Sequence, residues 1–432
     1  MKLLVVSPDY ASHVEPMLQI AAEWQRSTGP VVVATGTAVR SSVEQHHLAW
    51  TPLRLGRGSN AGVIRADEQP PGEDDHLREF FAATRAGAIE TLRYQAIARR
   101  HDLLFEPERI MVELATIIGE ERPDRVLVDH VAFGARLALH ALGITPATIV
   151  LGHPTALPAP GELYGLPSAW PEALRPRPAD LDDLVRLCAE STSELTCAAN
   201  LMLDSTAPHR ARLDDLTSLA GSPTIYMYPS ALHDERRVLP AGSRSIGSLR
   251  RDAVPGETTL PQGSGPLVLV ALGTFLSARD DVLRTSVSAA HLGAWRLAIA
   301  VGSTPIASIG SLPDGALARE HLPQVALLEH ADVLVTHGGN NSVTEACAAG
   351  VPMVVLPMST DQFAGAAAIE RAGIGIVLDP NTVTADELRN AVIEATTARV
   401  RRRVASVAES IRRDGGAHAA VGAILRHTAG QH

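Results

Sequence analysis

The chain has 432 residues, of which 48 are acidic and 38 are basic, so its formal net charge is −10. At roughly 100 to 200 residues per domain, this length predicts two to three domains. The negative charge argues against nucleic acid or an anionic membrane as a partner. No apolar run approaches the roughly 20 residues that a membrane span needs. Three cysteines without metal-ligand spacing read as reduced thiols, so we expect a cytoplasmic enzyme.

Strands and helices alternate along the first half of the chain, as expected for a parallel sheet covered on both faces. The buried strands are predicted at 3–7, 31–34, 48–53, 125–129, 148–151, 201–203 and 225–228. The helices are predicted at 14–25, 37–45, within 77–121 and at 181–197.

Two longer loops interrupt this alternation, at 56–75 and 154–178. The first exceeds what a compact domain normally carries without a purpose. The second leaves the carboxyl end of a strand, where open parallel sheets bind ligands. It is therefore either a surface connection or a loop that faces an acceptor.

The segment 248–266 is polar, rich in proline and glycine, and reads as a linker between domains at 1–247 and 267–432. A second alternating series follows it. Strands are predicted at 267–271, 297–301, 333–336, 354–356 and 376–378, with a helix near 282–292. Thr384 and Glu387 have the spacing of a capping box, which predicts the start of a helical C-terminus that runs to about residue 427.

The strand at 333–336 runs directly into the turn His337-Gly338-Gly339-Asn340-Asn341-Ser342. The two glycines allow a sharp turn and a close approach to a ligand. Ser342 and Glu345 also have capping-box spacing, which predicts that the next helix begins at Ser342. Free N–H groups and the helix dipole favour anions at such a helix N-terminus, so the turn predicts a phosphate site.

This stretch resembles the C-terminal donor signature of the UDP-glycosyltransferase superfamily, which comprises inverting nucleotide-sugar enzymes of GT-B fold. It is most similar to the bacterial members that glycosylate antibiotics and other natural products. The residues in family order and spacing are Pro323, Gln324, the turn 337–342, Glu345, Gly350, Val351, Pro352, Pro357, Asp361 and Gln362. The resemblance implies an α/β GT-B fold with two Rossmann-like domains facing each other across a cleft. The first would bind the acceptor and the second the donor, and the last helix would cross back to the first domain.

A hydroxyl acceptor must lose a proton as it attacks, and the imidazole of His13, in the loop after the first strand, suits that task. Taken alone, a histidine in such a loop is more often structural. However, Ser12-His13-Val14-Glu15-Pro16 resembles the family's Gly-His-x-x-Pro segment, whose histidine is the catalytic base. Asp129 ends the strand at 125–129 and matches the aspartate that holds this histidine in many members. The alternative is that Asp129 caps a helix beginning near Val131.

The resemblance also implies which residues bind the leaving diphosphate. They are His337 and the amides of Gly339, Asn341 and Ser342 in the glycine turn. A cationic or hydrogen-bonding side chain at His337 would offset the charge that develops on the departing phosphate. Gly273 and Thr274, after the strand at 267–271, would add a contact from the facing turn.

The rest of the donor is assigned in the same way. The family glutamate at the position of Glu345 binds the ribose hydroxyls, and the alternative is the capping box. Gln324 resembles the position that meets the nucleobase through its backbone. Asp361 and Gln362 resemble the pair that hydrogen-bonds the donor sugar, and the alternative is a polar helix start.

We therefore predict an inverting glycosyltransferase without metal or cofactor, using a UDP- or dTDP-sugar as co-substrate and a small natural product as acceptor. Aromatic residues form only 3% of the chain, so Tyr10, Tyr164 and Trp170 are the candidates for stacking on the acceptor. The alternatives are a GT-B epimerase or hydrolase, and a non-catalytic nucleotide-sugar-binding partner protein. A homodimer is compatible with the sequence.

Overall fold

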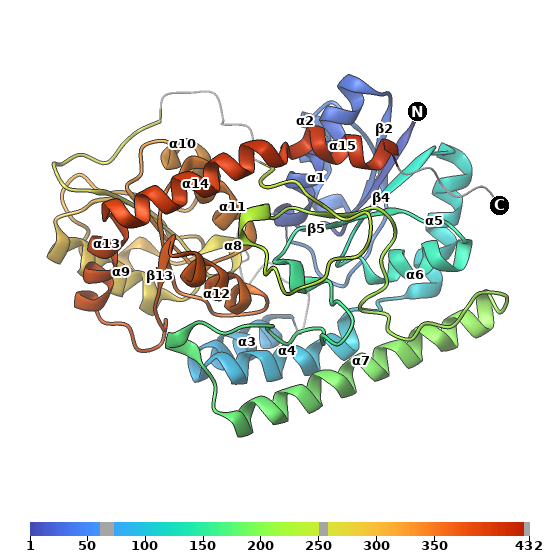
Figure 1. Cartoon of the computed structure of the whole chain (residues 1–432), viewed down its shortest axis with the longest axis horizontal. Helices are drawn as coiled ribbons and strands as arrows, with labels where there is room; N and C mark the ends of the chain where they lie inside the picture. The colour runs from blue at the N-terminus through green and yellow to red at the C-terminus, as the bar shows by residue number, and fades with distance from the viewer. Residues whose placement is uncertain (61–72, 250–257, 427–432) are drawn as a thin grey trace.

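Two parallel β-sheets form the centres of two α/β lobes in the computed structural model, which describes residues 1–60, 73–249 and 258–426 (Figure 1). The first lobe is built on a seven-stranded sheet and the second on a six-stranded sheet. This arrangement confirms the predicted GT-B architecture. Among the described helices, none is both long and apolar enough to cross a bilayer.

The first sheet has the strand order β3-β2-β1-β4-β5-β6-β7, and every neighbouring pair is parallel. Its strands are β1 (Leu3–Val6), β2 (Val31–Thr35), β3 (Ala49–Pro52), β4 (Arg125–Asp129), β5 (Ala147–Val150), β6 (Thr224–Tyr226) and β7 (Arg244–Ser245). Residues of β1, β2 and β4 are buried on both faces because helices cover both sides of the sheet. The two-residue edge strand β7 has too little apolar pattern to be visible in the sequence.

The second sheet has the order β10-β9-β8-β11-β12-β13 and is parallel throughout. Its strands are β8 (Leu267–Ala271), β9 (Arg296–Ala300), β10 (Leu317–Arg319), β11 (Val333–Thr336), β12 (Met353–Val355) and β13 (Gly375–Val377). The edge strand β10 was not predicted, because its three residues, Leu-Ala-Arg, carry no strand signal of their own.

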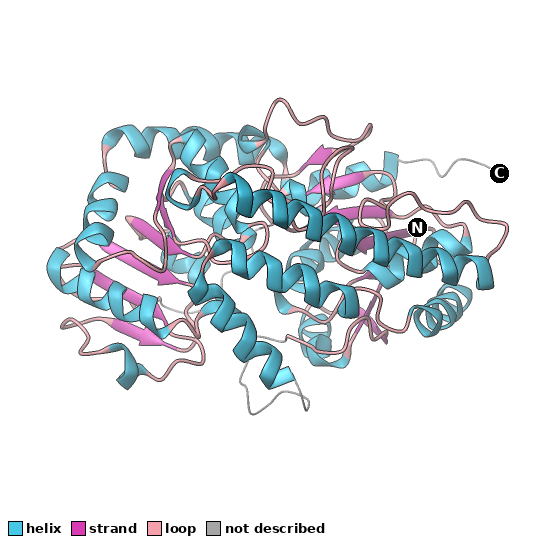
Figure 2. Cartoon of the chain, turned by 90° about the horizontal axis from the view of Figure 1, so that it is seen from below, coloured by secondary structure: helices cyan, strands magenta, loops and turns pink. Residues whose placement is uncertain are grey.

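Helices follow most strands and cover the faces of both sheets (Figure 2). The first half contributes α1 (Ala11–Ser27), α2 (Arg40–Gln45), α3 (Glu73–Ala86), α4 (Ala88–Asp102), α5 (Pro107–Glu121), α6 (Phe133–Leu142) and α7 (Pro178–Thr206). The second half contributes α8 (Gly273–Leu276), α9 (Asp280–Gly293), α10 (Gln324–Leu328), α11 (Asn340–Ala349), α12 (Gln362–Ala372), α13 (Ala385–Ala395), α14 (Ala398–Asp414) and α15 (Gly416–Arg426).

The strand predicted at 201–203 is wrong, because these residues form the last turns of α7. Leu201 is 63% exposed, whereas Met202 and Leu203 are buried, which is a helical pattern of burial. A short apolar run fits a strand and a helix equally well. The capping box at Thr384 and Glu387 is confirmed at the start of α13.

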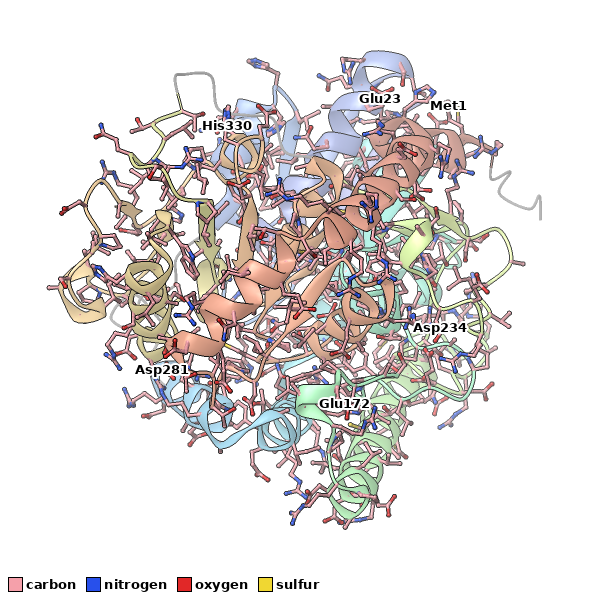
Figure 3. The ribbon with its side chains drawn as sticks, turned by 60° about the vertical axis from the view of Figure 1, so that its left-hand side comes forward. Met1, Glu23, Glu172, Asp234, Asp281 and His330 are labelled. Carbon is pink, nitrogen blue, oxygen red and sulfur yellow. The ribbon has the colours of Figure 1, made fainter. Side chains whose placement is uncertain are left out.

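The C-terminal helices connect the two lobes, and Figure 1 shows α14 and α15 running in red from the second lobe to the first. Ala420, Val421 and Ile424 of α15 pack into the same buried cluster as Trp24 of α1. Glu23, labelled in Figure 3, accepts a hydrogen bond of 3.1 Å from His418 of α15. The last helix therefore belongs to the core of the first lobe.

Helix α3 crosses between the lobes in the opposite direction. It belongs to the first half of the sequence but packs on the second lobe. Phe80 is 7% exposed and lies in the buried cluster that contains Val268 and Leu283. At the end of α3, the carbonyl of Thr84 accepts a hydrogen bond of 3.0 Å from Asn381 Nδ2.

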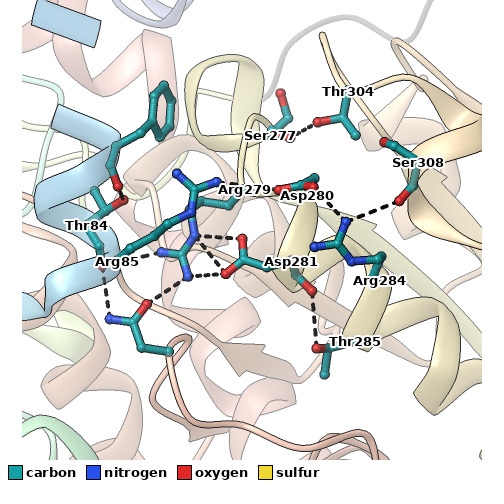
Figure 4. Close-up of polar contacts among 12 residues, drawn as sticks. Thr84, Arg85, Ser277, Arg279, Asp280, Asp281, Arg284, Thr285, Thr304 and Ser308 are labelled. Atoms are coloured by element: carbon teal, nitrogen blue, oxygen red, sulfur yellow. Dashed lines mark hydrogen bonds and ion pairs between the residues drawn. The ribbon is translucent and has the colours of Figure 1, made fainter. Parts of the chain in front are cut away.

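A buried arginine holds this junction together (Figure 4). Arg279 is fully buried, and its guanidinium donates to Asp281 at 2.7 and 2.9 Å and to Asn381 Oδ1 at 2.7 Å. It also donates to the carbonyl of Thr84 at 3.4 Å. A buried guanidinium is tolerated only when its donors have partners, so this network fixes the end of α3 on the second lobe.

We expect Arg279→Ala to lower the free energy of unfolding by about 2 to 4 kcal/mol, because it leaves Asn381 and a half-buried carboxylate without their donor. The matched control is Arg284→Ala, since Arg284 pairs with Asp280 at 2.7 Å near the surface. Exposed pairs contribute below about 1 kcal/mol. Urea unfolding of both variants measures the difference, and equal losses would contradict the role assigned to Arg279.

Candidate active site

The predicted functional residues gather where the strand order of each sheet reverses. In the first sheet, β1 lies between β2 and β4, so helices α1 and α6 leave in different directions. In the second sheet, β8 lies between β9 and β11 in the same way. Ligands bind at such switch points, beyond the carboxyl ends of the strands. His13 follows β1, Asp129 is the last residue of β4, and Gly273 and His337 follow β8 and β11.

A cleft of about 470 Å³ lies between the two switch points. Its volume is that of a typical small-molecule site. From the first lobe, His13, His130 and the loop that contains Tyr164 line it, and from the second lobe His337 and Asn341 do so. The structure thus brings the predicted base and the predicted phosphate turn into one cavity.

His13 and Asp129 are in direct contact. His13 Nδ1 lies 2.8 Å from Asp129 Oδ2, and the carboxylate is fully buried while 21% of the His13 side chain is exposed. The other oxygen of Asp129 accepts a hydrogen bond of 3.1 Å from the amide of Val131. The expectation that His13 lies in a loop is wrong, because α1 already begins at Ala11. The helix α6 has Ala132 as its N-cap, so Asp129 is not a helix cap.

This contact determines where the protons lie. Burial opposes the charged form of His13, but the charge of Asp129 and its hydrogen bond outweigh this effect and raise the pKa of His13 above its usual 6.5. Burial likewise disfavours the charged form of Asp129, but His13 and His130 hold the pKa of this carboxyl far below its usual range. An ionised carboxylate only accepts hydrogen bonds, so Nδ1 of His13 carries the proton and Nε2 is left as the basic nitrogen.

The sequence analysis missed His130, which lines the cleft next to His13. Its Nδ1 lies 3.0 Å from Asp129 Oδ1, and its ring stacks on that of His13 with the centroids 5.8 Å apart. Burial lowers the pKa of His130, so this imidazole is neutral at pH 7. Its position directly after Asp129, at the carboxyl end of β4, is the signal that could have identified it.

The three side chains also have the spacing of a metal site, since ligand atoms of His13, Asp129 and His130 lie within 4.8 Å of one another. The same closeness is accounted for by the contacts of both histidines with one carboxylate. The sequence analysis did not find this grouping, because His130 was not considered.

In the second lobe, the glycine turn leads directly into a helix with open amides. The helix α11 begins at Asn340 with Gly339 as its N-cap, so the capping box predicted for Ser342 and Glu345 is wrong. Serine or aspartate at the N-cap would occupy the first amides with a side-chain oxygen, whereas glycine leaves them free for an anion. Gly338 has φ +86°, and a Cβ there would lie 2.8 Å from Val355 Cγ1, so the turn requires glycine at this position.

His337 lies between two glycines from facing turns. A Cβ at Gly273 would lie 2.8 Å from His337 Cε1, and one at Gly339 would lie 2.3 Å from His337 Nε2. Burial lowers the pKa of His337 to about 4, so the unliganded imidazole is neutral and acts as a hydrogen-bonding group. An arriving diphosphate would raise this pKa by its charge. The side chain of Thr274 lies outside the described residues.

Glu345 and Gln324 are hydrogen-bonded to each other at the edge of the predicted donor site. The amide of Gln324 donates to Glu345 Oε2 at 2.7 Å and to Ser342 Oγ at 3.2 Å. Gln324 and Ser342 line the cleft, whereas Glu345 is 4% exposed and lies behind them. The ribose role of Glu345 and the nucleobase role of Gln324 stay predictions.

Asp361 and Gln362 line the cleft at the start of α12. Asp361 accepts hydrogen bonds from the backbone amide of His153 in the first lobe and, at 2.9 Å, from Thr360 Oγ1. Gln362 Oε1 accepts from the amides of Met358 and Ser359 at 3.0 and 3.1 Å. Both side chains thus shape the backbone at this position, and their sugar-binding role stays a prediction.

Two neighbouring asparagines of α11 reach across to the first lobe. Asn340 Nδ2 donates to the carbonyls of Leu151 and Met227, at 2.7 and 2.8 Å. Asn341 Nδ2 donates to the carbonyl of Ser12 at 2.8 Å. Within α1, this carbonyl would normally accept from residue 16, but Pro16 has no N–H. Pro16, three residues after His13, thus leaves free the carbonyl of Ser12 that Asn341 uses.

The three predicted acceptor aromatics have different surroundings. Tyr164 lines the cleft, and its ring packs edge-on against Phe133. The ring of Tyr10 lies edge-on to His13, with the centroids 6.0 Å apart. Trp170 stacks on Phe363 of α12 in a cluster between the lobes and is not among the described cleft-lining residues.

Comparison with known proteins agrees with this geometry. Residues 295–418 match the family model described as the C-terminal domain of erythromycin biosynthesis protein CIII-like proteins. Demethyllactenocin mycarosyltransferase of Streptomyces fradiae is 29% identical over 416 residues, which cover 94% of this chain and 82% of the relative. The NDP-glycosyltransferase YjiC of Bacillus licheniformis is 25% identical and covers 83% of this chain and 86% of its own.

Solved structures show the same fold. The glycosyltransferase of kitacinnamycin superposes with a TM-score of 0.71 at 25% identity, covering 98% of both chains. Calicheamicin glycosyltransferase CalG4 gives a TM-score of 0.65 at 19% identity, covering 98% of this chain and 97% of its own. Together with the two facing sites, these matches define the protein as a glycosyltransferase of GT-B fold. More narrowly, the family model and the similar antibiotic glycosyltransferases support the bacterial natural-product branch of these enzymes, which the signature residues predict.

We expect Gly339→Ala to weaken binding of UDP or dTDP roughly tenfold, since the added methyl group displaces His337 and crowds the amides of α11. Gly119→Ala in α5 is the matched control, because a Cβ there meets open space. Isothermal titration calorimetry with each nucleotide measures the effect. Unchanged affinity in Gly339→Ala would contradict the placement of the diphosphate at this turn.

Proposed function

We propose that the protein transfers a sugar from a UDP- or dTDP-sugar to a hydroxyl of a small natural product, with inversion at the anomeric carbon and without a metal. The observation that carries this proposal is the contact of His13 with Asp129, facing the open amides of α11 across the cleft. A base on one side and an anion site on the other are what a direct displacement requires.

In this mechanism, His13 Nε2 takes the proton of the acceptor hydroxyl as its oxygen attacks the anomeric carbon. Asp129 keeps Nδ1 of His13 protonated and stabilises the imidazolium that forms. The bond to the diphosphate breaks on the opposite face of the sugar, so a single displacement inverts the configuration. The amides of Asn341 and Ser342, together with His337, bind the leaving group and offset its charge.

The relatives support the nature of both substrates. Spinosyn rhamnosyltransferase SpnG has been solved with thymidine diphosphate and with spinosyn aglycone, and VinC with dTDP. Another relative is 4'-demethylrebeccamycin synthase of Lentzea aerocolonigenes, which is 26% identical over 90% of each chain. A nucleotide-sugar donor and a natural-product acceptor are therefore the substrate classes that we assign to this chain.

The test is transfer from UDP- and dTDP-sugars to a panel of hydroxylated natural products, followed by mass spectrometry and by NMR of the anomeric proton. We expect inversion, full activity in EDTA, and a loss of about 10²- to 10⁴-fold in His13→Ala, as is typical when a general base is removed. His46→Ala is the control, because His46 lies at the end of α2. Retained configuration, or transfer by His13→Ala at the wild-type rate, would contradict the mechanism. Sugar loss without an acceptor would favour the hydrolase alternative.

The raised pKa of His13 also predicts the pH dependence. Because the base must be neutral, kcat/KM for the acceptor should fall as the pH drops through a value above 6.5. Asp129→Asn removes the charge that raises this pKa, so the acidic limb should move to lower pH while the plateau rate decreases. Asp124→Asn is the control, since the carboxylate of Asp124 accepts a hydrogen bond from the amide of Lys2 and precedes β4, at the end of the strand opposite to Asp129. A limb that does not move in Asp129→Asn would contradict the pairing.

A further inference from the structure

Arg99 is the only lysine or arginine among the cleft-lining residues that the structure describes. It lies near the end of α4, and its guanidinium is stacked over the ring of Tyr164, with Cζ 4.8 Å from the ring centroid. Its Nη1 is buried and has no hydrogen-bond partner within the described residues. The stacking holds the plane of the guanidinium in place while its edge keeps unused donors.

The other arginines of α4 near the neighbouring helix are paired. Arg93 lies 2.7 Å from Glu90 and 3.4 Å from Asp183 of α7. Arg100 lies 3.0 Å from Glu194 of α7 and also donates to Ser191. In the described part of the chain, the guanidinium of Arg99 has neither an ion pair nor a hydrogen bond. The unpaired charge is thus on the side of α4 that faces the cleft.

The chain leaves room for this guanidinium. Gly165 has φ +86°, and a Cβ there would lie 2.0 Å from Arg99 Nη1. The same Cβ would lie 3.8 Å from the Cys188 sulfur. Burial raises the pKa of the Cys188 thiol, so this group is neutral and does not balance the charge.

Apolar residues of the first lobe line the cleft together with Arg99 and Tyr164, namely Val131, Leu166 and Pro167. A cation in such surroundings is costly unless an anion meets it. The predicted phosphate turn belongs to the second lobe, whereas Tyr164, the stacking partner of Arg99, belongs to the first.

We propose that Arg99, held against Tyr164, binds a carboxylate on the acceptor, remote from the hydroxyl that receives the sugar. A planar guanidinium with its edge free matches a carboxylate in a bidentate pair. The acceptor is then a largely apolar hydroxy acid. This inference rests on the proposed function, because it assigns the first-lobe part of the cleft to the acceptor.

The probes are 6-hydroxy-2-naphthoic acid and its methyl ester, which share an aromatic body and a hydroxyl and differ in charge. Their affinities are measured by calorimetry on the full chain saturated with dTDP or UDP, so that no sugar transfer is needed. We expect the wild type to bind the acid at least roughly tenfold more tightly than the ester, as for a charge-assisted hydrogen bond. Arg99→Gln should abolish this preference and leave the affinity for the ester unchanged.

Two further variants distinguish loss of the Arg99 charge from damage to the fold. Arg99→Lys keeps the positive charge and should retain part of the preference for the acid, whereas Arg93→Gln, on the same helix, should retain all of it. Thermal unfolding of each variant shows whether the fold is intact. A wild type that binds acid and ester equally, or that binds neither at millimolar concentration, overturns the inference, and so does an Arg99→Gln variant that keeps the preference.

The same probes separate this inference from the proposed function. Tight binding of the acid that Arg99→Gln abolishes, without transfer of any sugar to any acceptor, would count against the proposed transferase reaction and support the carboxylate site. Transfer to natural-product acceptors with equal binding of both probes would support the reaction and remove the site.

Discussion

The hydrogen bonds of Asn340 and Asn341 to the first lobe are the constraint on which the active site depends. Both side chains leave the first turn of α11, the element whose amides face the cleft. They end on carbonyls after β5 and β6 and on Ser12, next to His13. The first turn of α11 and the start of α1, which carries His13, are thus held in one arrangement by two adjacent asparagines. Pro16 contributes to this arrangement because it leaves the carbonyl of Ser12 without a helical donor.

The two lobes contribute different kinds of charge to the cleft that these contacts hold together. Among the described cleft-lining residues, the second lobe contributes the open amides of α11 and a neutral His337 but no lysine or arginine. Backbone dipoles of this kind favour an anion without a permanent cation. In the first lobe, the buried carboxylate of Asp129 contacts both histidines. Negative charge on Asp129 raises the basicity of His13, while burial keeps His130 neutral. The structure thus places the His13–Asp129 pair of the first lobe opposite the open amides of α11 in the second.

Much of this arrangement could be predicted from the sequence where local signals and the family pattern coincide. The buried apolar strands and the capping box at Thr384 are local features, and the structure confirms them. The prediction of a capping box at Ser342 failed because spacing alone cannot show where the side chain of Glu345 is bound. In the structure, Glu345 accepts a hydrogen bond from Gln324, which is distant in sequence. The strand prediction at 201–203 failed because so short an apolar run shows neither the period of a helix nor that of a strand.

The residues that were missed act through contacts that only the folded chain creates. His130 is important because it contacts the same carboxylate as His13. Asn340 is important because it donates to carbonyls that are far away in the sequence. Arg99 is distinguished from the other arginines of α4 only by the absence of a partner among the described residues, which no sequence pattern encodes.

The reciprocal exchange of α3 and α15 also limits how this enzyme can be recombined with its relatives. Phe80 of α3 completes the core of the second lobe, and Val421 of α15 completes the core of the first lobe. A chimera joined at the linker would combine helices and cores from different proteins in both lobes, since each half of the sequence carries a helix that packs on the other half. Recombining this chain with a homologue therefore requires grafts that keep α3 with its native second lobe and α15 with its native first lobe.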